Sequence, residues 1–287
     1  MIEFWVILTG VLVGITCSVA GVFLVLRKMS MIADAISHTV LFGIVMSFIV
    51  TQTLTGISMF IGAALAGLLT AFLVQYLRSS GIQEDAAIGI IFTTLFAVSV
   101  LLVTLYAGNV HLDVEHVLMG EIAFVPWETF TLFGLEMPKA VWMLGSSLLL
   151  NILILVAFYK EFKLSTFDAV YAASIGIPIV FMHYLFMLMI SFTTVSTFDS
   201  VGAILVIAML IGPAATAYLI SRSLKQMFGF AISFGVTAAV AGYYAAKWFD
   251  TSIAGMMAVM VGVLFVTVFM IQLLGRRLAK GSLQSKS

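Results

Sequence analysis

Residues 30–50 read SMIADAISHTVLFGIVMSFIV, a stretch long and apolar enough to cross a bilayer although it contains an aspartate and a histidine. Asp34 and His38 are four residues apart, so the 3.6-residue period of a helix places both side chains on one face. A charged residue at bilayer depth costs about 2.5–3.5 kcal/mol on insertion scales, and such residues usually face a bundle interior, a pathway or a partner. The pair is therefore a candidate metal or proton site on a transport path, with a packing hydrogen bond as the simpler alternative.

The composition of the whole chain indicates a polytopic membrane protein. Of its 287 residues 63% are hydrophobic and 9% are charged, and the mean hydropathy is +1.22. A water-soluble domain could not bury so much apolar surface in one core. The apolar stretches of about membrane-spanning length are residues 4–27, 30–50, 57–77, 85–107, 138–159, 179–198, 201–220, 227–246 and 253–274.

We therefore expect an all-α fold in which a single transmembrane domain covers residues 1–287. Only Phe198-Asp199-Ser200 separates the sixth apolar stretch from the seventh, so these two could form a tight hairpin or one re-entrant unit. The sequence thus predicts nine transmembrane helices, with eight as the alternative. The one cysteine, Cys17, excludes both a disulfide framework and a thiolate cluster.

The basic residues orient the chain in the membrane. With the N-terminus outside and nine spans crossed, one side receives Arg27, Lys28, Arg78, Lys160, Lys163, Arg222, Lys225, Arg276, Arg277, Lys280 and Lys286. Only Lys139 and Lys247 fall opposite. The positive-inside rule makes the basic side and the C-terminus cytoplasmic. The outer side is then net negative, which raises the local concentration of cations at its mouth.

The longest polar interruption, residues 108–137, lies outside on this map. Pro126 and Trp127 suggest short amphipathic helices at the membrane interface with an aromatic anchor. Such a platform could receive an extracellular partner. Its acidic residues, Glu121 and Glu128 among them, would form salt bridges in that contact.

The longest cytoplasmic segment is residues 160–178. Ser165 or Thr166 can cap a helix, Asp168 suits its first turn, residues 169–174 are permissive for helix and Gly176 favours a stop. We expect a short helix suited to docking into a groove of another protein, although an ordinary connector is the alternative.

The chain carries no motif for nucleotide hydrolysis. A Gly-x-x-x-x-Gly-Lys-Ser/Thr phosphate loop is missing from the sequence, as is a His-Glu-x-x-His or comparable catalytic set. The chain is therefore not expected to be an enzyme, and any energy from ATP must come from a separate subunit.

The sequence resembles the permease subunits of manganese, zinc and iron ABC importers. The matching passages follow the family's order and are residues 25–29, 34–38, 84–90, 167–176, 201–206 and 213–217; residues 115–126 look closest to manganese-type members. The resemblance implies a type II, vitamin B12 importer-like permease in a bacterial cytoplasmic membrane. It also implies a second permease copy or a homologous permease, a cytoplasmic ATPase dimer and an extracellular metal-binding protein as partners, besides membrane lipid and without nucleic acid.

The resemblance implies roles for individual residues as well. Asp34 and His38 match the pair that contributes to the family's metal site, and the segment from Phe167 through Asp168 and Ala172 to Gly176 looks like the coupling helix that meets the ATPase. One carboxylate and one imidazole form an incomplete shell, which a two-fold dimer would double. Such ligands suit Mn²⁺, Fe²⁺ or Zn²⁺, expected here as transported substrate and not as a resident cofactor. A secondary transporter or channel using the pair for proton coupling is the alternative.

Overall fold

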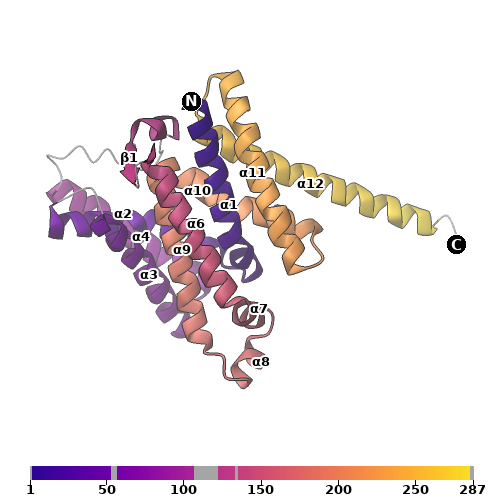
Figure 1. The fold of residues 1–287 in the computed structure, drawn as a ribbon. Coiled ribbons are helices and arrows are strands. Elements are labelled where there is room, and N and C mark those ends of the chain that lie inside the picture. Colours follow the sequence, from indigo (N-terminus) through magenta and orange to yellow (C-terminus); the bar gives the residue numbers. More distant parts are fainter. Residues whose placement is uncertain (1, 53–56, 107–121, 133–134, 285–287) are drawn as a thin grey trace.

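The computed structural model describes residues 2–52, 57–106, 122–132 and 135–284, and these are almost entirely helical (Figure 1). Nine helices in this described part are long and apolar enough to cross a membrane, as the nine-span prediction requires. They are α1 (Ile2–Leu26), α2 (Ser30–Thr51), α3 (Ile57–Ser79), α4 (Glu84–Tyr106), α6 (Lys139–Ala157), α9 (Ile179–Val201), α10 (Ala203–Ile220), α11 (Leu224–Phe249) and α12 (Ile253–Gln284).

The segment between α4 and α6 differs from its prediction. Where it is described, it forms a short 3₁₀ helix, η1 (Ile122–Trp127), and an antiparallel hairpin of β1 (Thr129–Leu132) and β2 (Leu135–Pro138) in place of amphipathic helices. The sequence Thr-Phe-Thr-Leu of β1 combines β-branched and aromatic residues, which favour strands over helices. The hairpin is the one departure from an all-α fold in the described ranges.

The sixth and seventh spans are separated by a single residue. α9 continues through Asp199 to Val201, and α10 begins at Ala203. Gly202 between them has φ 79° and ψ 165°, a backbone conformation essentially confined to glycine. The predicted separation at residues 198–200 is therefore wrong by a few residues, because glycine, and not the polar Asp199, permits the change of direction.

Small residues bring the helices into close contact. A Cβ atom added to Gly21 of α1 would lie 1.9 Å from the carbonyl oxygen of Leu210 in α10, and Gly43 of α2 faces Gly62 of α3 in the same way. Interfaces of this kind let helix backbones approach within a membrane. α1 packs with α10 and α11, and α2 packs with α3 and α4, which lie together on the left of Figure 1.

The basic turns gather at one end of the bundle. Arg27, after α1, donates hydrogen bonds to the hydroxyls of Ser165 and Thr166 in α7 (Tyr159–Phe167), the helix before α8 (Ala169–Ser174). At the opposite end of α1, Glu3 forms an ion pair with Lys247 of α11. Arg27 and Lys247 therefore lie at opposite ends of the bundle, and Glu3 is the partner of Lys247.

Candidate metal site and coupling segment

The central part of the transmembrane helix α2 is buried except along one ridge. Between Ile32 and Val45, every residue is buried except Asp34, His38 and Phe42, which are partly exposed. These positions are four residues apart and so form one ridge of the helix. The ridge continues to the exposed Met46 and Val50. The two polar residues of α2 identified from the sequence therefore lie on the part of the helix that the described chain leaves uncovered.

The side chains of Asp34 and His38 point to the same region but are not hydrogen-bonded to each other. His38 Nε2 lies 3.6 Å from Asp34 Oδ1, beyond the usual length of a hydrogen bond. The His38 side chain is 28% exposed and that of Asp34 is 40% exposed. Both retain ligand atoms that can reach a group outside this subunit.

Aromatic rings of α4 line one side of the histidine. The ring centroids of Phe92 and Phe96 lie 5.0 Å and 6.0 Å from that of His38. These rings replace water on that side of the imidazole. An ion held beside them would interact more strongly with the Asp34 carboxylate than in bulk water, because the local dielectric constant is lower.

One chain supplies an incomplete metal shell. Among the residues that the structure describes, no three His, Cys, Asp or Glu side chains are grouped closely enough to hold a metal ion. Zn²⁺ usually takes four ligands, and oxygen-rich sites of harder divalent cations take about six. Asp34 and His38 can therefore form only part of a complete site.

The segment predicted to couple to an ATPase folds much as its sequence predicts. α8 spans Ala169–Ser174, and Gly176 follows it with φ +88°. The N–H of Ile177 donates to the carbonyl of Ala172, the contact expected of a glycine-terminated helix. Asp168 is the N-cap and not a first-turn residue: its carboxylate accepts from the Tyr171 N–H at 2.9 Å.

Ser165 and Thr166 do not cap this helix. They lie within α7 and accept hydrogen bonds from Nη2 and Nε of Arg27 at 2.9 Å and 3.0 Å. Arg27 thereby joins the turn before α2 to the segment before α8. The sequence analysis used Arg27 as an orienting charge and as part of the matching passage 25–29, and it did not predict these hydrogen bonds. The signal was the position of Arg27 directly after a long apolar helix, where a guanidinium needs hydrogen-bond partners.

The exposed surface of the coupling segment is apolar. Val170 of α8 is 83% exposed, and Phe167, Tyr171 and Ile175 are also exposed, whereas Ala172 is fully buried within the chain. Exposed apolar groups of this size mark an interaction surface. Ala172 therefore serves the packing of α8, and its neighbours form the surface that a partner can contact.

The predicted outer docking pair is located only in part. Glu128 is exposed beside the exposed Trp127 at the end of η1, and its backbone carbonyl accepts from the N–H of Lys139. Glu121 lies outside the described residues. The structure therefore does not bring the two carboxylates together or separate them.

A family model described as the ABC 3 transport family matches residues 1–272. The chain belongs to this family. The manganese transport system membrane protein MntD of Bacillus subtilis (strain 168) is 56% identical to it, over 93% of this chain and 91% of the relative. The zinc transport system membrane protein TroD of Treponema pallidum (strain Nichols) is 43% identical to this chain, over 92% of this chain and 72% of the relative.

A solved structure shares the fold of this ABC 3 family member. PsaBC from Streptococcus pneumoniae in complex with Fab superposes with a TM-score of 0.77 at 33% identity, over 92% of this chain and 90% of that one. Family membership confirms the resemblance drawn from the sequence passages. The chain is thus a multi-pass membrane permease subunit of a bacterial ABC transporter, and ATP hydrolysis belongs to a separate subunit.

Proposed function

We propose that this ABC 3 family chain is the permease subunit of an ATP-driven importer of divalent metal ions, working by alternating access, with manganese as the favoured metal. The observation that carries the proposal is the ridge of α2, where Asp34 and His38 are two of the three partly exposed residues in an otherwise buried stretch. Relatives named for manganese and zinc transport support the substrate class.

A second permease would complete the site. The uncovered ridge would place Asp34 against lipid in an isolated chain, and a charged group in contact with hydrocarbon is costly. A two-fold dimer of this chain, or its pairing with a homologous permease, would cover the ridge and bring two carboxylates and two imidazoles together. Four oxygen and nitrogen ligands without a thiolate suit Mn²⁺, Fe²⁺ or Zn²⁺.

These ligand types do not by themselves select manganese. Zn²⁺ binds a given nitrogen and oxygen site more tightly than Mn²⁺ in the usual order of stability. The preference for manganese is drawn from the 56% identical manganese-system relative. Selection would rest on the geometry of the completed site and on the protein that delivers the metal.

The two ends of the bundle would bind different partners. With the N-terminus outside and the C-terminus in the cytoplasm, the apolar surface around Val170 faces the cytoplasm and would dock into the ATPase dimer. The outer segment, with Glu121 and Glu128, would receive an extracellular metal-binding protein. Its acidic side chains would act mainly on the rate of that association.

An uptake assay separates the proposal from a proton-coupled secondary transporter or a channel. The complete transporter, purified through a tag on this chain and reconstituted into vesicles, is expected to accumulate Mn²⁺ only with ATP on the ATPase side and to continue after a protonophore collapses the proton gradient. Uptake without ATP that stops with the protonophore would establish the secondary transporter instead. Competition with Zn²⁺ in the same assay tests the preference for manganese.

A further inference from the structure

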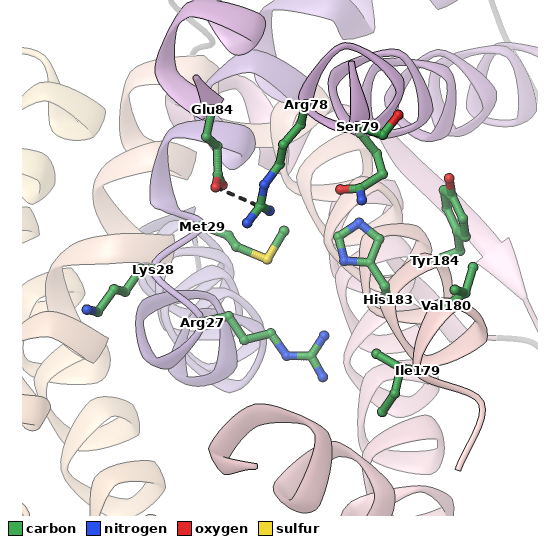
Figure 2. A pocket seen from close by; sticks show the side chains of 11 residues that line it. Arg27, Lys28, Met29, Arg78, Ser79, Glu84, Ile179, Val180, His183 and Tyr184 are labelled. Atoms are coloured by element: carbon green, nitrogen blue, oxygen red, sulfur yellow. Dashed lines mark ion pairs between the residues drawn. The ribbon is translucent and has the colours of Figure 1, made fainter. Parts of the chain in front are cut away.

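A cavity whose lining does not include Asp34 or His38 lies at the end of the bundle that carries the basic turns. It has a volume of about 620 Å³ and forms where the α1–α2 turn, the end of α3 and the starts of α4 and α9 meet (Figure 2). This volume falls in the range of small-molecule sites, roughly 300–1,000 Å³. Nothing in the proposed transport of a metal ion uses it.

The lining of the cavity is strongly cationic. Arg27, Lys28 and Arg78 contribute positive charges, and Glu84 is the single carboxylate among the lining residues. Glu84 Oε2 lies 3.2 Å from Nη1 of Arg78, so that acid offsets one of the three cations. A divalent cation would be repelled from this space, which makes it unsuited as an exit for the metal.

Arg27 holds a positive charge that no carboxylate of the described residues neutralises. Its guanidinium lies 4.9 Å from the Phe186 ring centroid and donates to Ser165 and Thr166. These two hydrogen bonds leave further N–H donors of the five that a guanidinium carries. Burial lowers the pKa of Arg27 to about 10, which still leaves it protonated at neutral pH.

Several donors converge on the same space. In Figure 2 the ends of the Arg27, Arg78 and His183 side chains lie around Met29, whereas Lys28 extends away from them. Gln75 of α3 adds an amide to the lining, whereas the Ser79 hydroxyl donates its proton to the carbonyl of Tyr76. Guanidinium groups bind phosphate oxygens through paired, charge-assisted hydrogen bonds, and the Gln75 amide can donate to a remaining oxygen.

We propose that this cavity is a binding site for a phosphate-bearing anion. On the proposed orientation it opens on the cytoplasmic side, where basic pockets between transmembrane helices bind anionic lipid headgroups. A phospholipid headgroup and a free phosphate ester share the recognised chemistry, and the apolar side chains of Ile179 and Val180 at the rim suit either a lipid glycerol or a small organic phosphate.

Binding can be measured on the full-length chain purified in a zwitterionic detergent, without metal or ATP. The probes are phosphatidylglycerol, phosphatidylcholine, inorganic phosphate and glycerol phosphate, and the readouts are the thermal unfolding midpoint and native mass spectrometry. Retention of phosphatidylglycerol but not phosphatidylcholine would identify a lipid ligand. Saturable stabilisation by phosphate or glycerol phosphate would identify a soluble one. If no phosphate-bearing probe binds, the proposal is wrong.

Substitutions of the two partners of the Arg78–Glu84 ion pair should change the affinity for the probe in opposite directions. Arg78→Gln should weaken binding of the effective probe roughly tenfold, because a charge-assisted hydrogen bond is lost. Glu84→Gln should strengthen it, because the single lining carboxylate is removed and Arg78 is released. Lys225→Gln removes a cation from the same end of the bundle but not from the cavity, and should leave binding unchanged.

The gain in Glu84→Gln guards against misfolding as an explanation, since a damaged chain would not bind more tightly. Equal binding by the Arg78 and Lys225 variants, or no gain in the Glu84 variant, would overturn the site. Because the assay needs neither uptake nor ATP, its outcome is independent of whether the chain imports metal.

Discussion

The carboxylate of Asp34 distinguishes a transport site from a packing contact. Asp34→Asn keeps the size of the side chain and its ability to accept a hydrogen bond from His38, but it removes the charge that is proposed to bind a cation. We expect Mn²⁺ uptake by the reconstituted transporter to fall at least roughly tenfold, and His38→Ala to have a similar effect. Both variants should purify and unfold like the parent chain.

Asp250→Asn is the matched control, since it makes the same chemical change at the exposed C-cap of α11. Uptake by this variant should be unchanged. Near-normal uptake by Asp34→Asn, with the same preference among metals, would show that the pair only packs helices.

Gly43 tests whether the close contact between α2 and α3 is required. A Cβ at this position would lie 2.3 Å from the carbonyl oxygen of Gly62 and 2.6 Å from the Cα of Ala63, and backbone atoms cannot rotate away. Gly43→Ala should therefore cost about 1–3 kcal/mol of stability, seen as a lower unfolding midpoint in detergent.

The control for this packing is Gly89→Ala in α4, where an added Cβ meets nothing within 4 Å. Alanine there should keep or slightly raise the midpoint, because it is the better helix former. Indistinguishable midpoints for the Gly43 variant and the parent chain would mean that the two helices can separate without penalty.

The sequence predicts which residues share a helix face but not which face is covered. The spacing of Asp34 and His38 sufficed to place them together. Whether a partner helix, lipid or another subunit lies against them could not be derived, because the remainder of α2 is apolar and lipid tails are as apolar as a protein core. For the same reason the burial of Ala172 inside the chain emerged only from the fold.

At the scale of a single element, α8 offers a test of docking to the ATPase. Val170→Asp places a charge at the most exposed apolar position of this short helix without burying it in the chain. Loss of one anchor of an interface costs more than about 1 kcal/mol, so the affinity of the permease for its ATPase should fall about fivefold or more. Copurification of the two subunits, and binding of the ATPase to the permease immobilised on a surface, would measure this affinity.

Lys225→Gln changes the charge by the same amount in the first turn of α11 and should not affect ATPase binding. Ala172 is unsuitable for such a test, because a larger residue there would disrupt α8 itself. Full ATPase affinity in Val170→Asp would remove this surface from the coupling contact.

Some elements of secondary structure are determined by local sequence signals and could be predicted, whereas others depend on the fold and could not. The apolar spans and the glycine stop after α8 follow from composition and backbone chemistry, and both were predicted. The β1–β2 hairpin was missed because a four-residue strand signal is weak beside aromatic residues that also suit a membrane interface. The separation of α9 from α10 was misplaced because a polar residue was weighted above Gly202.

For the whole molecule, the proposed dimer can be tested with a single cysteine. The native Cys17 is buried and can be replaced by serine or alanine. Met46 lies on the ridge of Asp34 and His38, and its exposed position should face the second permease. In a complex with two copies of this chain, Met46→Cys should therefore form an oxidative cross-link in membranes that doubles the apparent mass.

Val156→Cys is the comparison, since this residue is exposed on α6, away from the ridge. It should remain unlinked under the same oxidation. A cross-link of Met46→Cys to a different, homologous permease would identify a heterodimer. If both variants stay monomeric while uptake is intact, the ridge is covered by something other than a second permease.

Because only Gly202 separates α9 from α10, a movement at one end of α9 would be transmitted to α10 at its other end. This helix begins four residues after α8 and runs without interruption for 23 residues, or about 35 Å at 1.5 Å per residue. A tilt of about 10° around its inner end would displace the outer end by about 6 Å. Only Gly202 connects that end of α9 to α10. If the ATPase docks at α8 as proposed, a small movement of α8 would therefore be enough to shift the opposite end of the membrane domain.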